Sequence, residues 1–192
     1  MSLIDTKTDL LNDLNIDGEA NFTSLDSMVA GETKFVRDLR MNVKNSINTD
    51  NLTLKEAYII ALSIAVNEKN ESLIAGFEDL AKENGASAGE VAEAHAAASM
   101  LAVNNVFYRF RHYIEEGTYN SIPARLRMNI MLNPVMGKEL FELVSLSVSA
   151  VNGCEACVRS HEKVLRETGV SEQKIFECVR LAAVIRGLSI SL

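Results

Sequence analysis

The chain has 192 residues, of which 47% are hydrophobic and 23% charged, and its formal net charge is -7. A chain of this length forms one domain that buries roughly 70% of its unfolded surface, and the acidic balance argues against nonspecific electrostatic binding of nucleic acid or an anionic membrane. Residues 1–10 contain no apolar signal core, and no segment approaches the roughly 18 apolar residues of a membrane span, so we expect a cytoplasmic protein in a reducing compartment.

Helices are predicted almost throughout the chain, which has only two prolines and is rich in good helix formers. Residues 1–25 are the exception, because their weak periodicity predicts a mostly irregular segment. The S/T-x-x-E spacing of a capping box occurs twice, at Thr53 with Glu56 and at Ser87 with Glu90. In a capping box the hydroxyl and the carboxylate each accept a hydrogen bond from a free backbone amide at the helix start. Two helices are therefore expected to begin there.

Most helix ends are predicted at glycines, because a residue without Cβ readily adopts the left-handed conformation that closes a helix. The candidates are Gly85, Gly117, Gly137, Gly153, Gly169 and Gly187. Between Pro123 and Pro134 we expect one brief helix around the sequence RLRMNI. Residues 143–150 alternate apolar and polar side chains, which is typical of a strand, but the length of this segment and its start in KELFE favour a helix.

An internal repeat is predicted from self-similarity. Sliding the sequence by 84 residues aligns residues 85–87 with 169–171, so that glycine and serine match at the same helix junction, and seven further positions match as well. Helical sequences rich in Ala and Glu also match by chance, but the paired Gly and Ser weaken that explanation. The single domain, residues 1–192, is therefore expected to contain a first repeat at 54–101 and a second at 138–185.

The chemistry is concentrated in the second repeat, in the sequence NGCEACVRSH. A C-x-x-C pair in a chain without secretory context is typical of thiol and disulfide exchange. Because Cys154 follows Gly153, we expect it in the first helical turn, where the positive end of the helix dipole favours a thiolate by about 0.3–1 kcal/mol. Cys157 and His161 follow on the same face, which the flanking apolar residues direct into the bundle.

The first repeat lacks this chemistry. At the positions equivalent to Glu142, Cys154, Cys157 and His161 it carries Tyr58, Asn70, Leu73 and Phe77. None of these can perform the same thiol and proton chemistry, so the first repeat is predicted to serve as scaffold.

Four segments together carry a more specific pattern. They are NNVFYR at 104–109, LRMNI at 126–130, FELVSLSVSAVNGC at 141–154 and the C-x-x-C-x-x-x-H that begins at Cys154. These segments closely resemble the alkylhydroperoxidase D (AhpD) family, within the carboxymuconolactone decarboxylase-like superfamily. The spacing of a glutamate, eleven residues and then C-x-x-C-x-x-x-H is far more specific than a C-x-x-C pair alone.

The resemblance implies an all-α protein that assembles as a homotrimer and reduces hydroperoxides with thiols. It implies that Cys157 attacks the peroxide and becomes a sulfenic acid, that Cys154 resolves it as a disulfide, and that Glu142 and His161 form a proton relay. No bound cofactor is implied. Electrons are expected from a dihydrolipoyl group on a lipoylated carrier protein, and a peroxiredoxin is a possible partner in that family.

Two features depart from this picture. The positive end of the helix dipole alone predicts that Cys154 is the more acidic thiol. The family resemblance implies instead that Cys157 attacks the peroxide. Family members often carry a second histidine between the cysteines, where this chain has Ala156. Position 156 is expected about 100° around the helix from Cys157, so that a histidine there would reach the site only through a water or a neighbouring helix. We expect slow peroxidase turnover, and Ala156→His to raise it.

Other functions remain open at this point. The main alternative is a thiol–disulfide exchange partner or redox sensor that does not turn over peroxide. Zinc binding by the two cysteines, His161 and Glu142 is less favoured, because three ligands on consecutive turns of one helix form a poor tetrahedron. A decarboxylase-like protein would share the scaffold but would not need the cysteine pair.

Several residues also have purely structural interpretations. Cys178 is expected to be a small core residue. His95 and His112 are expected at the surface or in packing rather than as ligands. Glu142 could be a solvated helix residue.

Overall fold

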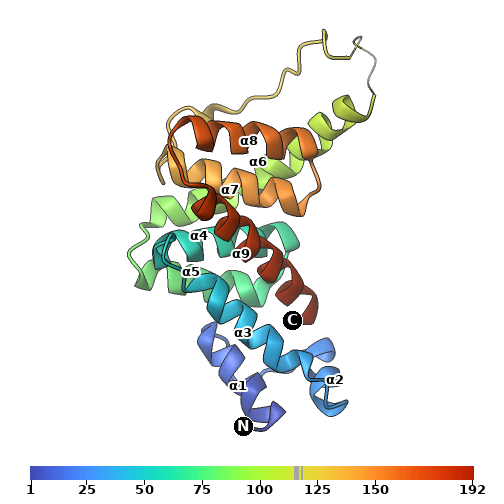
Figure 1. The fold of residues 1–192 in the computed structure, drawn as a ribbon, viewed down its shortest axis with the longest axis vertical. Helices are drawn as coiled ribbons and strands as arrows, with labels where there is room; N and C mark the ends of the chain where they lie inside the picture. Colours follow the sequence, from blue (N-terminus) through green and yellow to red (C-terminus); the bar gives the residue numbers. More distant parts are fainter. Residues whose placement is uncertain (115–116, 118) are drawn as a thin grey trace.

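The computed structural model describes residues 1–114, 117 and 119–192, and these residues form helices without any strand (Figure 1). The all-α prediction is thus confirmed for the described part of the chain. Its helices are α1 (Leu3–Asp13), α2 (Thr23–Ala30), α3 (Phe35–Ile47), α4 (Leu54–Glu68), α5 (Glu71–Glu83), α6 (Ala88–Tyr113), the short 3-10 helix η1 (Asn129–Met131), α7 (Lys138–Val151), α8 (Glu155–Glu167) and α9 (Glu172–Ser191).

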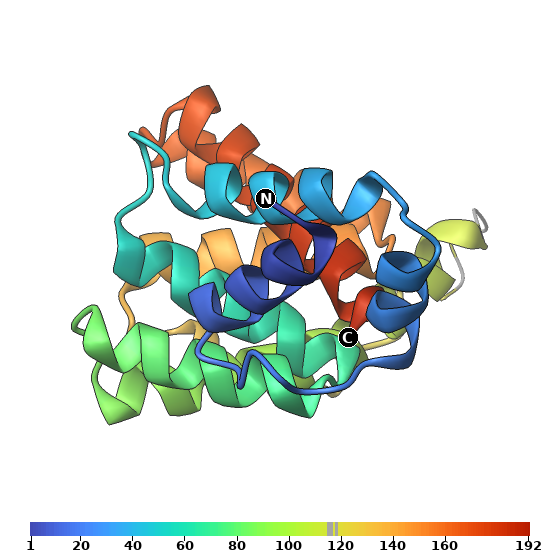
Figure 2. The same cartoon turned by 90° about the horizontal axis from the view of Figure 1, so that it is seen from below.

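Helices α4 and α7 form the centre of the molecule. They pack against each other, α4 also packs against α5, α6 and α9, and α7 against α6, α8 and α9. Both central helices are apolar on most sides, which is typical of buried helices, and Ile60 and Phe141 are fully buried. Helices α1, α2 and α3 lie together at one end of the molecule, and α8 lies toward the other end, beyond α7 (Figure 1). Figure 2 shows the molecule from the end where α1 to α3 lie.

The expectation of an irregular N-terminus is wrong. Helix α1 begins at a capping box, in which the Ser2 hydroxyl accepts from the Asp5 amide at 3.0 Å and the Asp5 carboxylate accepts from the Ser2 amide at 2.9 Å. Leu10 and Leu11 of this helix are fully buried. Short helices such as α1 and α2 depend on packing against the rest of the fold, which a weak local period does not show.

The predicted starts of two helices are confirmed. Thr53 caps α4 and Ser87 caps α6, each through a complete capping box. Residues 143–150 lie within α7, so the helical interpretation of the alternating segment is also confirmed. Two of the expected helix ends are wrong, because Gly137 is the N-cap of α7 and Gly187 lies inside α9. The brief helix expected between the prolines is the three-residue η1, which contains only the last two residues of RLRMNI.

The helices of the two predicted repeats begin at matching positions. The first residues of α4, α5 and α6 are each followed 84 residues later by the first residues of α7, α8 and α9. Gly85 and Gly169 both have positive φ, at 91° and 88°, where a side chain would be strained.

None of the helices in the described part of the chain is long and apolar enough to cross a membrane.

Candidate active site

The two cysteines of the C-x-x-C pair form a disulfide at the start of α8. Their Cα atoms are 5.3 Å apart, within the usual range for a disulfide. Gly153, with φ at 68°, turns the chain from α7 into α8. Cys154 is the N-cap of α8, one residue before the helix, and not in its first turn as expected. Cys154 is fully buried and Cys157 is 8% exposed, so the predicted inward orientation is confirmed.

Glu142 of α7 and His161 of α8 are hydrogen-bonded to each other. The Nδ1 atom of His161 lies 2.7 Å from Glu142 Oε2, and Lys138 Nζ lies 2.8 Å from Glu142 Oε1. Glu142 is only 3% exposed. The interpretation of Glu142 as a solvated helix residue is therefore wrong.

The environment of Glu142 keeps this carboxyl ionised. Burial acts to raise its pKa, but hydrogen bonds from His161 and Lys138 outweigh burial and hold the pKa below its ordinary value of 4.5. An ionised carboxylate can only accept, so the Nδ1 atom of His161 carries the hydrogen in this bond. The Nε2 atom of His161 is then the ring nitrogen that can take up or release a proton.

A pocket of about 340 Å³ is lined by both His161 and Cys157. Its walls come from α6, from the segment that carries η1, and from α8. The lining residues are Leu101, Asn104, Asn105, Tyr108, Met128, Met131, Ala156, Cys157, Ser160 and His161. The pocket is mainly apolar, with a few polar groups, as small-molecule sites usually are. We call it the inner pocket.

The structure thus brings the predicted site residues together in one place. Cys157 and His161 line the inner pocket, Glu142 holds His161, and Cys154 is bonded to Cys157 behind the pocket. Ala156 lines the same pocket as Cys157. The expectation that position 156 reaches the site only through water or a neighbouring helix is therefore wrong.

Sequence reasoning missed several residues of the site. Lys138 lies four residues before Glu142, and this i,i+4 spacing could have identified it as a partner. The walls formed by Tyr108 and Met128 could not be found in this way. Residues 104–109 and 126–130 carried the family pattern, but nothing local indicates that they pack beside α8.

Cys178, His95 and His112 agree with their structural interpretations. Cys178 is fully buried, and burial raises the pKa of its thiol to about 12, which makes it unreactive. His95 pairs with Glu78 and His112 with Glu155 on partly exposed parts of the surface. Among the residues that the structure describes, no three His, Cys, Asp or Glu side chains are grouped so that they could hold a metal ion.

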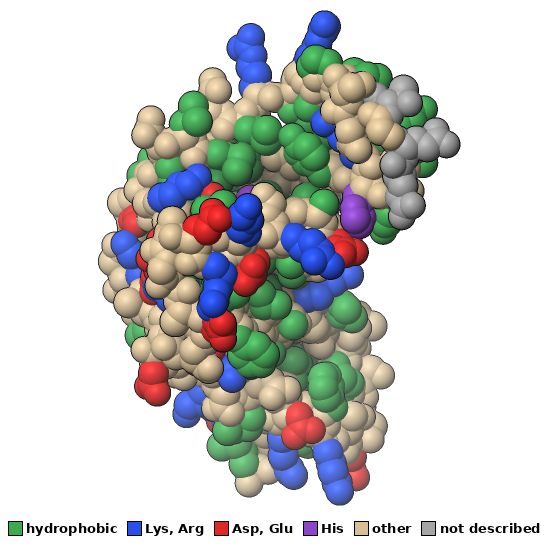
Figure 3. Space-filling view, turned by 45° about the horizontal axis from the view of Figure 1, so that its top comes forward, with side chains coloured by type: hydrophobic (Ala, Val, Ile, Leu, Met, Phe, Trp, Pro, Cys, Tyr) green, Lys and Arg blue, Asp and Glu red, His purple; other side chains and the backbone are tan. Residues whose placement is uncertain are grey.

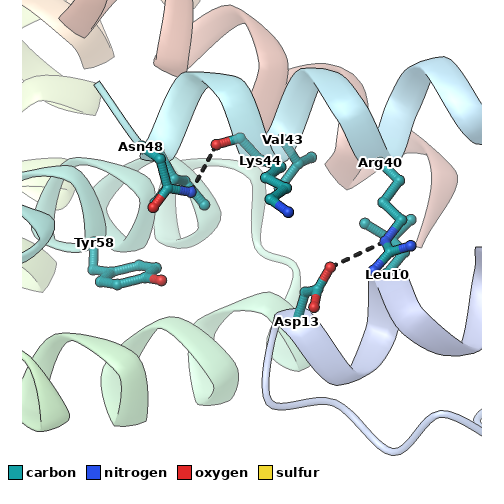
Figure 4. A pocket seen from close by; sticks show the side chains of 8 residues that line it. Leu10, Asp13, Arg40, Val43, Lys44, Asn48 and Tyr58 are labelled. Atoms are coloured by element: carbon teal, nitrogen blue, oxygen red, sulfur yellow. Dashed lines mark hydrogen bonds and ion pairs between the residues drawn. The ribbon is translucent and has the colours of Figure 1, made fainter. Parts of the chain in front are cut away.

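Another pocket, of about 170 Å³, lies between α1, α3 and Tyr58 of α4 (Figure 4). Arg40 lines it, and its guanidinium pairs with Asp13 at 3.1 Å and with Asp9 at 2.7 Å. It contains none of the predicted site residues, and its Arg40 side chain is already paired with two carboxylates.

Comparison with known proteins agrees with this arrangement. The profile of the "Carboxymuconolactone decarboxylase family" matches residues 119–190. A protein named "Alkyl hydroperoxide reductase AhpD" from Rhodopseudomonas palustris is 40% identical over 169 residues, which cover 88% of this chain and 93% of that protein. Proteins of the same name from an Anaeromyxobacter species and from Streptomyces griseus are 41% and 38% identical, again over 88% of this chain and over 90% and 95% of their own lengths. This chain belongs to the AhpD family. The resemblance seen in the sequence of this AhpD-family protein is thereby confirmed, and it extends well before residue 100.

Proposed function

We propose that this protein is a thiol-dependent hydroperoxide reductase that cycles between a Cys154–Cys157 dithiol and its disulfide. The observation that carries the proposal is the inner pocket, in which Cys157 and the Glu142-bound His161 face the same cavity. A thiol and a base held within one cavity are what nucleophilic cleavage of a peroxide requires. The names of the 40% identical relatives support the same reaction.

In the proposed reaction His161 takes the proton of Cys157 at Nε2 while Glu142 stabilises the imidazolium. The Cys157 thiolate attacks the outer oxygen of R–O–O–H, which breaks the O–O bond, gives Cys157–SOH and releases RO⁻. One proton converts RO⁻ into ROH. The Cys154 thiol then attacks the sulfenic acid, forms the disulfide and releases water. Two thiols and one hydroperoxide thus give one disulfide, one alcohol and one water.

Access supports Cys157 as the attacking thiol. Cys157 lines the inner pocket, whereas Cys154 is fully buried and does not reach it. Cys154 also lies at the N-cap of α8, where helix-end electrostatics favours its thiolate. We therefore assign the attack to the sulfur that a peroxide can reach, and resolution of the sulfenic acid to the thiol at the helix end.

The electron donor and the partners are part of the same proposal. We expect the disulfide to be reduced by a dihydrolipoyl group of a lipoylated carrier protein, and a peroxiredoxin to be a second possible partner. No resident cofactor is needed for this cycle, because oxidation of the two thiols to a disulfide supplies the two electrons that reduce the hydroperoxide. The alternative function is a disulfide-exchange protein or redox sensor, which is favoured by Ala156, where family members often have a histidine.

A homotrimer is proposed on the family resemblance and on one surface feature. Along α6, the apolar residues Val103, Val106, Phe110 and Tyr113 are 45–70% exposed and are spaced by three and four residues. This spacing places them on one face of the helix, and exposed apolar faces commonly mark protein contacts. Figure 3 shows hydrophobic side chains at the surface in the upper part of the molecule. Light scattering that gives a monomer would contradict the trimer.

The decisive experiment measures consumption of tert-butyl hydroperoxide by the pure protein with dihydrolipoamide as electron donor. Cys157→Ser should abolish turnover, and Cys178→Ala is the matched control that should retain it. Turnover in Cys157→Ser would contradict the assignment of the attacking thiol. A wild-type protein that exchanges its disulfide with dihydrolipoamide but consumes no hydroperoxide would favour the exchange or sensor function instead.

A further inference from the structure

A second cavity adjoins the inner pocket, and we call the boundary that two residues share between them the neck. This outer pocket has a volume of about 460 Å³ and is lined by Tyr108, Arg111, His112, Asn120 and Ala156. Only Tyr108 and Ala156 line both pockets among the described residues. Tyr108 is half-buried on α6, and Ala156 lies on α8 directly before Cys157. Tyr108 therefore borders the cavity that Cys157 and His161 also line.

We infer that the Tyr108 hydroxyl is the acid that protonates the departing alkoxide when Cys157 cleaves a hydroperoxide. The inference rests on the proposed function and adds a catalytic residue to it. Ala156, which has only a methyl side chain, lines the same two pockets as Tyr108, so the phenol is a proton donor at the place where family members often have a histidine.

The other polar side chains of the inner pocket are less suited to this role. Asn105 is engaged at both ends, because its Oδ1 accepts from Asn152 and its Nδ2 donates to Ser149, both at 2.9 Å. Asn104 donates to the sulfur of Met128 at 3.1 Å. Amides and the aliphatic hydroxyl of Ser160 are far weaker acids than a phenol, so they can hold an oxygen but do not readily give it a proton.

In this mechanism His161 acts as the base for the Cys157 thiol and not as the acid for the alkoxide. Its Nδ1 is bonded to Glu142 at 2.7 Å, and Nε2 takes the proton of the Cys157 thiol before attack. When the O–O bond breaks, the Tyr108 hydroxyl gives its proton to RO⁻, which leaves as ROH. The tyrosinate then regains a proton from the imidazolium of His161, directly or through water. The thiol proton therefore ends on the alcohol, and Tyr108 and His161 return to their starting states.

The test is a single-turnover measurement on the reduced trimer or monomer, whichever the pure protein forms. Disulfide formation is followed by quenching and mass spectrometry after addition of either tert-butyl hydroperoxide or peracetic acid. The first substrate releases a strongly basic alkoxide that needs a proton, whereas the second releases acetate, which does not. General-acid catalysis contributes about 10²–10⁴ in rate, and His161 can replace part of it.

Tyr108→Phe should therefore slow the reaction with tert-butyl hydroperoxide by at least about tenfold and leave the reaction with peracetic acid within about twofold. Tyr58→Phe is the matched control, since Tyr58 lies on α4 against Phe77 and lines neither pocket. Equal slowing with both substrates would show a merely structural role and overturn the inference. An unchanged rate with tert-butyl hydroperoxide would overturn it as well.

A second variant tests whether the neck is the place of proton delivery. The double variant Tyr108→Phe with Ala156→His places an imidazole at the same boundary and should restore most of the lost rate with tert-butyl hydroperoxide. No recovery would count against delivery at the neck. A wild-type protein that reacts with neither substrate would refute the proposed function itself, whereas failure of Tyr108→Phe to discriminate between substrates refutes only the role of Tyr108.

Discussion

The two halves of the bundle differ most at one pair of side chains. In the first unit, residues 54–101, Tyr58 and Phe77 pack with ring centroids 6.4 Å apart. At the equivalent positions of the second unit, residues 138–185, Glu142 and His161 are hydrogen-bonded at 2.7 Å. The equivalent positions thus hold an aromatic pair in one half and a hydrogen-bonded Glu–His pair in the other. If the proposed roles are correct, substitutions at these two positions are enough to separate a scaffold from a site.

Other equivalent pairs show that the framework itself is shared. Glu93 accepts from the backbone amides of Val135 and Met136 just before α7, at 2.8 and 2.7 Å. Glu177, 84 residues after Glu93, accepts from the side chain of Asn51 just before α4, at 3.0 Å. Each glutamate is therefore hydrogen-bonded to the segment that precedes the first helix of the other unit. This reciprocity supports the predicted duplication.

An ion pair recurs between the units with its charges exchanged. Lys55 pairs with Glu90 at 2.8 Å in the first unit, and Glu139 pairs with Lys174 at 2.7 Å in the second. Position 55 corresponds to 139 and position 90 to 174, so the interaction is kept although neither residue is. A search for identical residues cannot find such a pair.

The largest expected effect comes from replacing Glu142 and His161 of the second unit by the tyrosine and phenylalanine found at the equivalent positions of the first unit. His161→Phe should lower kcat/KM for hydroperoxide by about 10²–10⁴, because the base for Cys157 is lost. It should also destabilise the protein by about 1–3 kcal/mol, since Glu142 stays buried with one partner fewer. Adding Glu142→Tyr should recover part of the stability but none of the activity. Activity assays and urea unfolding check the two effects.

The matched control for this exchange is Phe77→Tyr in the first unit, which should leave kcat/KM unchanged. Activity that survives His161→Phe, or falls equally in Phe77→Tyr, would contradict the division into scaffold and site.

The next effect concerns the pH dependence of stability. The pKa of Glu142 is lowered in the folded protein, so its ionised form stabilises the fold at pH values above the ordinary 4.5, and this contribution is lost as the pH falls through the lowered pKa. Glu142→Gln should therefore cost about 1–3 kcal/mol near pH 7, and the difference from wild type should shrink below pH 4.5. Urea unfolding across pH 3–8 measures this; a difference that does not change with pH would contradict it.

The sequence predicts much of this site because its central part is local. Cys154, Cys157 and His161 lie within two helical turns, and the glutamate that precedes them at a fixed distance completes the family pattern. The structure confirms their burial and proximity, while their catalytic roles are still predictions. The helical class followed in the same way from caps such as Thr53.

The remaining features depend on contacts between distant segments. Tyr108 and Met128 reach the inner pocket only because α6 and the η1 segment pack beside α8, and no local period shows this. Helix α1 was missed for the same reason, since its buried Leu10 and Leu11 pack against other parts of the fold.

The smallest expected effect concerns the stability lost because a cysteine, and not a capping side chain, lies at the start of α8. Asn70, the N-cap of α5, has φ -93° and ψ 98°, and its side chain accepts from the Leu73 amide at 3.1 Å. Cys154, the N-cap of α8, has almost the same backbone angles, φ -92° and ψ 89°, but makes no such bond with its side chain. The thiol thus occupies a position where asparagine would satisfy the free amide of Cys157.

Cys154→Asn should therefore stabilise the protein by about 0.5–2 kcal/mol relative to reduced wild type, which is the usual value of a side-chain N-cap. It should also prevent turnover, because the sulfenic acid on Cys157 is no longer resolved. Urea unfolding under reducing conditions measures the stability, and Cys154→Ala is the control that lacks both the thiol and the cap. If the Cys154→Asn variant is no more stable than the Cys154→Ala variant, the equivalence of the two caps fails. A gain in stability together with lost turnover would show that the second unit keeps a weaker helix start because its chemistry needs a thiol there.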